Sequence, residues 1–200
     1  MDTPEEMERE EWHSKVYDEI SSEAIAEFSS ELLRSYYLEN PLLAKNAFTI
    51  FREAKSLAIT SPTAALVLYT TAIEVMLKST VLKPVIYGLV HNVLIADLVS
   101  DLVVKNNGID RFQAILSVIL DEYAEIDINT YKIPGHSKTI WEEIKNIQVA
   151  RNAVMHRAQP ALPEMAELAK EVAEIVIIDF LQGIVKNFGL QLQSDGVIVT

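Results

Sequence analysis

Residues 61–82 read SPTAALVLYTTAIEVMLKSTVL, and we expect the fold to be built around this segment. Ser61 followed by Pro62 is a typical helix start, because serine caps the open N–H groups of the first turn and proline is tolerated there. From Thr63 to Leu82 the segment is apolar nearly all round, so it leaves little polar face for water. We therefore expect a helix from Thr63 to about Leu82 at the centre of a helical protein.

Helical segments are also expected on both sides of this central one. Apolar periodicity and the breaking residues between segments predict helices over 42–59, 84–105, 110–125, 139–157 and 163–188. Pro84 either ends the central helix or begins the next one. With 6 glycines and 7 prolines in 200 residues, long regular elements are favoured. The predicted fold class is all-α, with about seven helices.

Three regions differ in character. Residues 1–40 are predicted to form an acidic helical arm, which begins at Thr3-Pro4 with a cap followed by proline. Residues 41–189 form the helical domain, and residues 190–200 are a short tail, either a strand or disordered. Within the domain, His91, Ile95, Leu98 and Leu102 share one apolar stripe, so we expect His91 to be a core histidine.

The bulk composition excludes several classes of protein. The chain has no cysteine, which rules out disulfides, thiolate catalysis and cysteine-ligated zinc. No spacing of residues resembles a metal site or a glycine loop for phosphates. The start of the chain lacks a signal-peptide layout, and the nearly uncharged run Ala64–Leu77 is too short to span a bilayer. We expect a soluble, cytoplasmic protein with no membrane contact and no cofactor.

Charge is distributed unevenly along the chain. The net charge is −12, which argues against loose, charge-driven binding to nucleic acid. Residues 129–163, however, carry five Lys or Arg against two acidic residues, a balance of +3. This is the charge that a local phosphate site on an acidic protein requires.

The net-positive segment contains the sequence Arg151-Asn152-Ala153-Val154-Met155-His156 near the end of the helix expected over 139–157. Arg151 occupies a place in the apolar stripe of that helix, so it must pair with an acid, lie at a subunit interface or line a cleft. Asn152 and His156 share the adjoining face with Lys145 and Val149. Five residues turn an ideal helix by about 140°, so Arg151 and His156 diverge. They meet at one phosphate only if the helix end frays or a second chain contributes.

These residue types are suited to RNA cleavage without a metal. RNA carries its own nucleophile, the 2′-hydroxyl, and histidine can accept or donate the proton near neutral pH. Arginine stays charged and can stabilise the phosphate as negative charge builds on its oxygens. Asn152 can hold the histidine tautomer or a phosphate oxygen. Arg157, Lys145 and His136 are candidate contacts to RNA or phosphate.

The pattern Arg-x4-His at the end of a helix in an all-α domain resembles the HEPN (higher eukaryotes and prokaryotes nucleotide-binding) family. The resemblance covers residues 42–189, while the acidic arm departs from it. It implies an antiparallel helical bundle and an endoribonuclease that leaves a 2′,3′-cyclic phosphate. It also implies a homodimer whose two protomers build one composite cleft. Family members of this kind act as toxins or in defence, balanced by an antitoxin.

Several alternatives remain open at the level of sequence. Glu74 is the one charge between Ala64 and Leu77, and it can pair with Arg151 as a supporting residue of the site or with Lys78 on the helix surface. Arg151 can be a structural ion-pair partner of a buried acid, and His156 can serve the helix dipole. The chain can accordingly be a catalytically silent HEPN module that binds a nucleotide or a protein partner, or an antitoxin-like scaffold.

Overall fold

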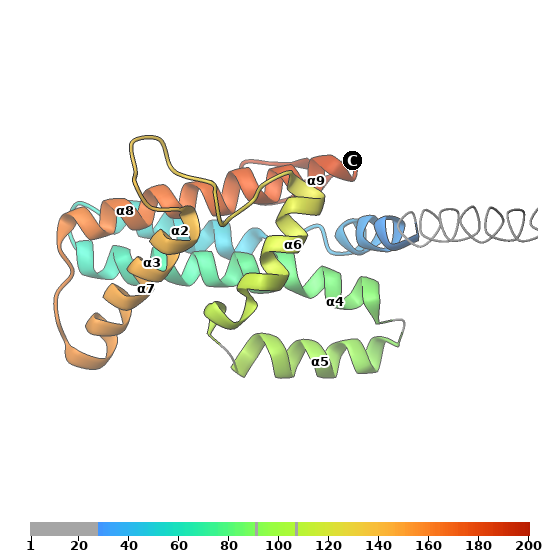
Figure 1. Ribbon diagram of the computed structural model, residues 1–200, viewed down its shortest axis with the longest axis horizontal. Helices are drawn as coiled ribbons and strands as arrows, with labels where there is room; N and C mark the ends of the chain where they lie inside the picture. The colour runs from blue at the N-terminus through green and yellow to red at the C-terminus, as the bar shows by residue number, and fades with distance from the viewer. Residues whose placement is uncertain (1–27, 91, 107) are drawn as a thin grey trace, which may run out of the picture.

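The computed structural model describes residues 28–90, 92–106 and 108–200, which are predominantly helical (Figure 1). Helical segments that follow one another without a break join into seven rods within these ranges. In chain order the helices are residues 28–39, α2 (Lys45–Leu57), α3 (Pro62–Val75), α4 (Lys83–Leu89), α5 (Val93–Asn106), α6 (Gln113–Ala124), α7 (Ile140–Arg157), α8 (Pro163–Glu174) and α9 (Leu181–Asn187). The all-α prediction is confirmed.

The central rod is longer than the sequence indicates. α3 continues through a π-helical segment, Met76–Leu82, into α4 without a break at Pro84. Proline has no N–H, so the carbonyl of Thr80 four residues earlier would lose its partner. The hydroxyl of Tyr37 donates to that carbonyl at 2.8 Å instead. Pro84 therefore lies in the first turn of α4, as one of the two expectations has it, but the chain does not leave the helix there, because a tertiary hydrogen bond replaces the missing helical one.

This rod, Pro62–Leu89, has the length and hydropathy of a membrane span. Its most apolar window is 61% buried inside the protein, however, where α2, α7 and α8 pack against α3. Burial of this extent is what a central helix of a soluble bundle requires. The rod is therefore compatible with a soluble protein.

A second long rod runs beside the first. α8 passes through another π-helical segment, Ile175–Phe180, into α9. The amide of Ala161, just before α8, donates to Oγ1 of Thr63 at the start of α3 (3.0 Å), and the two π-helical segments also contact each other. The rods therefore run in the same direction (Figure 1), whereas the HEPN resemblance implied antiparallel neighbours.

The described part of the arm and the tail both pack on the domain. Residues 28–40, assigned to the arm, contribute Leu33 and Tyr37 to the common core, while the expected helix start at Thr3 lies outside the described residues. The tail forms a hairpin of β1 (Gln191–Leu192) and β2 (Ile198–Val199). Its Ile198 is buried and donates its amide to the Pro41 carbonyl at 2.9 Å. Of the two expectations for the tail, the strand is confirmed.

α5 packs mainly against α4 and leaves much of its surface uncovered. The Tyr87 hydroxyl of α4 donates to the Asp97 carboxylate of α5. Ile95, Leu98 and Leu102 are exposed, so the prediction that their stripe faces the core is wrong. His91 lies outside the described residues. The small side chains of Ala96 and Ser100 face the body instead.

Candidate functional site

α7 is a regular helix throughout the motif. At its start, Oγ1 of Thr139 accepts the Glu142 amide (3.3 Å) and the Glu142 carboxylate accepts the Thr139 amide (2.8 Å). The backbone hydrogen bond from Thr139 is the main reason that the pKa of Glu142 lies below its ordinary value. At the other end, Ala158 closes the helix in the left-handed conformation (φ 52°), and its amide still reaches the Val154 carbonyl at 3.1 Å. The helix does not fray at His156.

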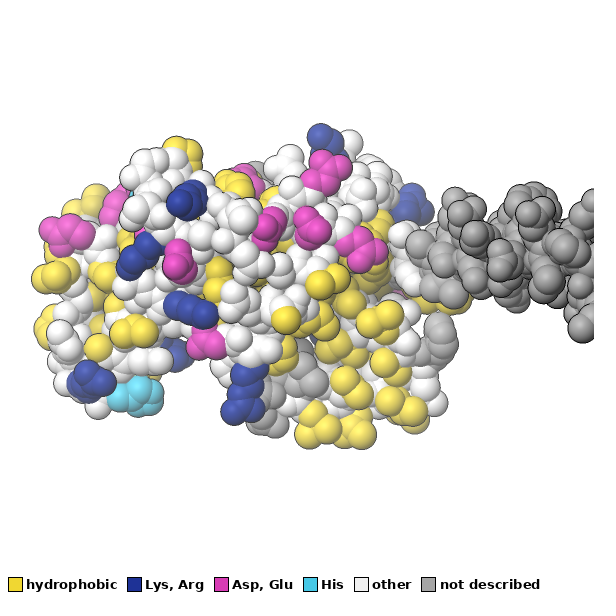
Figure 2. Space-filling model, in the orientation of Figure 1, with side chains coloured by type: hydrophobic (Ala, Val, Ile, Leu, Met, Phe, Trp, Pro, Cys, Tyr) yellow, Lys and Arg dark blue, Asp and Glu magenta, His cyan; other side chains and the backbone are white. Residues whose placement is uncertain are grey.

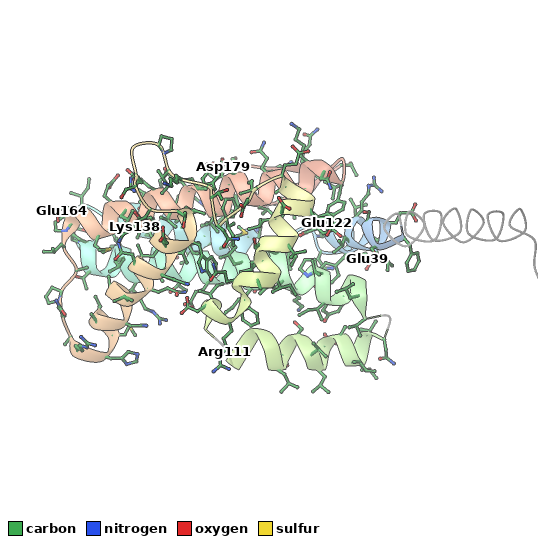
Figure 3. All side chains as sticks on the ribbon, in the orientation of Figure 1. Glu39, Arg111, Glu122, Lys138, Glu164 and Asp179 are labelled. Atoms are coloured by element: carbon green, nitrogen blue, oxygen red, sulfur yellow. The ribbon has the colours of Figure 1, made fainter. Side chains whose placement is uncertain are left out.

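The two halves of α7 have opposite environments. The first half is embedded in the core through Ile140, Trp141, Glu143, Ile144, Ile147 and Gln148. From Val149 onward every residue is exposed or half-buried, and the helix end projects from the body (Figures 1 and 3). The motif therefore lies on an anchored but accessible helix.

One exposed face runs along α7 from its embedded half to its end and is polar except at Val149. Lys145, Val149, Asn152 and His156 repeat at intervals of three or four residues and are all exposed. We call these four residues the α7 stripe. From Lys145 to His156 it extends about 16 Å along the helix. Arg157, also exposed, lies beside His156 in the last turn, where the helix dipole favours positive charge.

Arg151 is half-buried but directs its guanidinium toward this stripe. Its Nη1 donates to Oδ1 of Asn152 at 3.1 Å. Its Nε is buried and has no hydrogen-bond acceptor among the described residues. A desolvated donor on a cation without a counter-ion is uncommon in folded proteins and is satisfied when an anion binds.

No carboxylate within the described ranges forms an ion pair with Arg151. The buried acid of its own helix, Glu143, is held by Nδ1 of His136 (3.3 Å) and Nδ2 of Asn146 (3.3 Å). Glu74 is half-buried in α3, and over the same ranges it pairs with neither Arg151 nor Lys78. The structure thus lacks both ion pairs expected for Glu74 and the structural ion pair expected for Arg151.

His136 lies far from the motif. Its two ring nitrogens approach Glu143 Oε1 (3.3 Å) and Glu171 Oε2 (3.2 Å), which fastens the loop before α7 to α7 and α8. Glu143 precedes His156 by 13 residues, or about 20 Å along the helix. Because both of its nitrogens are occupied, His136 is a structural residue here and does not join the predicted RNA contacts.

A polar cluster that the sequence did not indicate adjoins the Lys145 end of the stripe. Lys145 Nζ donates to Gln113 Oε1 (3.2 Å) and lies 5.8 Å from the centre of the Trp141 ring. Gln113 donates to Asn129 (3.0 Å), which donates to Ser117 (2.7 Å). Gln113, Ser117 and Asn129 line a shallow depression of about 490 Å³ together with Asp110 and Arg111. α6 and the loop after it are brought next to α7 by the tertiary fold. The spacing of residues in the sequence therefore does not predict the cluster.

Charged and apolar side chains are unevenly distributed over the surface. On the face shown in Figure 2, most Lys and Arg side chains lie over the α7 half of the domain, with a few at the opposite end, and the largest group of hydrophobic side chains lies over the α5 half. Arg111, labelled in Figure 3, lies between these regions at the entry to α6. The net-positive segment found in the sequence therefore reaches the surface around α7.

Comparison with protein-family models, with curated proteins and with solved structures finds no match to this chain. The residues that carry the HEPN resemblance are arranged as follows. Arg151 and Asn152 are in contact, and Asn152 and His156 lie one turn apart on the same face. Arg151 and His156 make no hydrogen bond with each other.

Proposed function

We propose that the protein is a metal-independent endoribonuclease of the HEPN type that acts as a homodimer. The observation that supports this proposal best is Arg151, a half-buried cation with an unsatisfied Nε, hydrogen-bonded to Asn152 beside the exposed His156. A phosphate group supplies the acceptor that this guanidinium lacks. Arginine suits this task because its planar group donates to two oxygens at once.

The proposed reaction is an internal transesterification at a phosphate of RNA. The 2′-oxygen of one nucleotide attacks the adjacent phosphorus, and the bond from phosphorus to the 5′-oxygen of the next nucleotide breaks. One histidine accepts the 2′-hydroxyl proton and another donates a proton to the leaving 5′-oxygen. Arg151 stabilises the charge on the phosphate oxygens. The products are a 2′,3′-cyclic phosphate and a free 5′-hydroxyl.

A dimer provides the two histidines. Within one chain α7 stays helical to Arg157, so Arg151 and His156 do not converge through fraying. Two α7 helices from two protomers place two copies of Arg151, Asn152 and His156 around one phosphate. Lys145 and Arg157 then hold the flanking phosphates along the stripe. By analogy with the HEPN family, we place the activity in the cytoplasm, in a toxin or defence role controlled by a partner protein.

Cleavage of RNA by purified protein in the presence of EDTA tests the proposal. We expect the wild type to produce fragments with 2′,3′-cyclic phosphate ends, and His156→Ala to lower the rate by at least 100-fold, about the contribution of a general acid or base. Met155→Ala is the matched control, because Met155 is an exposed neighbour in the same helical turn. Equal cleavage by the wild type and His156→Ala, or products with 3′-hydroxyl ends, would refute the assignment.

A second candidate is a catalytically silent module that binds a nucleotide. It is favoured by the lack of a direct Arg151–His156 contact, since Arg151 with Asn152 can hold a phosphate without a proton-transfer partner. This candidate predicts that ADP or AMP binds to the wild type, that Arg151→Ala abolishes binding, and that RNA remains intact. The scaffold interpretation predicts a large fall in melting temperature for Arg151→Ala. We expect a small one, because Arg151 has no ion pair to lose among the described residues.

A further inference from the structure

α5 presents its large side chains to solvent and its small ones to the protein. Ala96 and Ser100, which face the body, are 0% and 4% exposed. On the other side, Leu94, Leu98 and Leu102, together with Ile95 and Val93, are between 51% and 79% exposed. Leu89 at the end of α4 falls in the same range. We call these six aliphatic residues the α5 face.

The α5 face is unusually large and apolar for a surface exposed to solvent. Its side chains present on the order of several hundred Å² of apolar area, comparable with the largest patches on monomeric proteins and approaching the roughly 800 Å² per partner of a standard interface. Figure 2 shows hydrophobic side chains continuing from α5 toward α6, where Ile115 and Val118 are also exposed. The area therefore suffices for a stable protein–protein contact.

The pattern of the α5 face is symmetrical. Leu94, Leu98 and Leu102 recur every four residues and so form a row centred on Leu98. A two-fold axis through Leu98, perpendicular to the helix, places Leu94 of one copy against Leu102 of the other. A two-fold interface requires such a self-complementary patch, because the same surface is used by both subunits.

We propose that the α5 face is the contact between two copies of this chain, which pack their α5 helices antiparallel about Leu98. The inference does not rest on the proposed function, because its residues are distinct from the α7 stripe. The α5 contact forms in the free protein, whereas the proposed composite site brings two α7 helices together around bound RNA. Molecular mass measured without RNA and RNA cleavage are separate measurements, so failure of one proposal is distinguishable from failure of the other.

The charges around the face predict how this dimer responds to salt. Asp97 and Asp101 flank the leucines, and each whole chain carries a net charge of −12. Two such chains repel each other, and salt screens the repulsion while leaving apolar burial intact. Association through the α5 face therefore strengthens with ionic strength. A contact held by ion pairs would weaken instead.

The absence of cysteine from the chain allows a direct test. Under mild oxidation of the full-length protein, Leu98→Cys should form a disulfide-linked dimer, because a symmetrical disulfide needs Cα atoms within about 7 Å. In the antiparallel arrangement Leu94→Cys is separated from its own copy by about 12 Å along the helix and should stay unlinked. Ile59→Cys, 94% exposed in the turn before α3, is the matched control outside the face.

Sedimentation of unlinked protein completes the test. In the absence of RNA, we expect the wild type to have twice the chain mass of 22.4 kDa, and the double variant Leu94→Gln, Leu98→Gln to be monomeric with an unchanged circular dichroism spectrum. Ile59→Gln should remain dimeric. A wild type that is monomeric at high salt, a double variant that is dimeric without RNA, or equal cross-linking at positions 59 and 98 would overturn the inference.

Discussion

α3 and α5 are both apolar helices of 14 residues, yet they occupy opposite environments. α3 has neighbours on several sides, and its Leu66 and Ile73 are fully buried. α5 has α4 as its main neighbour, and its Leu94 and Leu98 are exposed. An apolar sequence thus indicates that a helix has side chains to bury. Whether they are buried within one chain depends on how many other helices pack against it.

Polar residues in the two helices reinforce this difference. Thr70, buried in α3, donates its hydroxyl to the Leu66 carbonyl of its own helix at 2.8 Å, so it needs no external partner. α5 instead uses Ala96 and Ser100 as its contact residues, which permit a close approach to the body but bury little apolar area. α3 is therefore stabilised within the chain, whereas α5 still has apolar surface to bury.

The largest expected effect is in the buried helix. Leu66→Ala should lower the free energy of unfolding by about 2–5 kcal/mol, because it removes a fully buried side chain and leaves a cavity. Urea denaturation followed by circular dichroism measures this change. Ile59→Ala, at an exposed position, should cost far less; equal losses for both variants would contradict the buried assignment of α3.

Removing the hydrogen bond from the Tyr37 hydroxyl to the Thr80 carbonyl should cause the next largest loss of stability. Tyr37→Phe leaves the Thr80 carbonyl without its donor in a buried location, which costs about 1–3 kcal/mol. The same denaturation experiment applies. Tyr87→Phe, which removes the hydroxyl that bonds to Asp97 in α5, is the counterpart and should cost less because that contact is more exposed. The reverse order would show that α5 is held more firmly than the core.

A small effect is expected for α5 itself. Leu98→Ala should change the free energy of unfolding of the monomer by less than about 0.5 kcal/mol, since the side chain is already exposed. The measurement requires a dilution at which sedimentation shows only monomer. At higher concentration the wild type should gain stability and the variant should not, because a partner that binds only folded protein raises stability by mass action.

The smallest effect concerns pH. Burial, followed by the hydrogen bond to Asp97, raises the pKa of Tyr87 above its ordinary value of 10.0. The neutral hydroxyl is thus favoured in the folded protein, so the α4–α5 contact is fully present below pH 10.0 and is lost as the pH rises through the higher folded-state pKa. The tyrosinate absorbance of the wild type minus that of Tyr87→Phe should show a step above pH 10.0. A step at or below that pH would contradict the contact.

The elements of the fold that the sequence predicts well are those with local signals. Ser61-Pro62 begins α3, Thr139 caps α7 and Gly189 follows the last helix, where its φ of +68° suits glycine. The errors arise where distant residues intervene. The sequence around Pro84 contains no sign that Tyr37 will replace the missing donor. A largely apolar helix such as α5 likewise has no local feature that shows which side faces the body.

The candidate site shows the same difference between features with local sequence signals and features that depend on distant residues. Local spacing predicts the exposed face shared by Lys145, Asn152 and His156, because helical geometry alone fixes it. The partners of Arg151, Glu74 and His136 depend on how separate helices meet, and spacing does not determine them. His136 shows this most clearly, since Glu143 and Glu171 are brought to it by two different helices.

The closing contacts of the domain also affect how fast it can fold. The Nε of Arg34 donates to the Phe188 carbonyl at 3.1 Å across 154 residues of chain, and the Ile198 amide reaches back to Pro41. During synthesis the early helices emerge with these positions empty. Such long-range contacts slow folding, because the chain loses the entropy of its distant parts before the contact between them stabilises the fold. A chain that ended between α7 and α9 would lack both closing contacts and would leave part of the core uncovered, because Ile184, Val185 and Phe188 belong to that core.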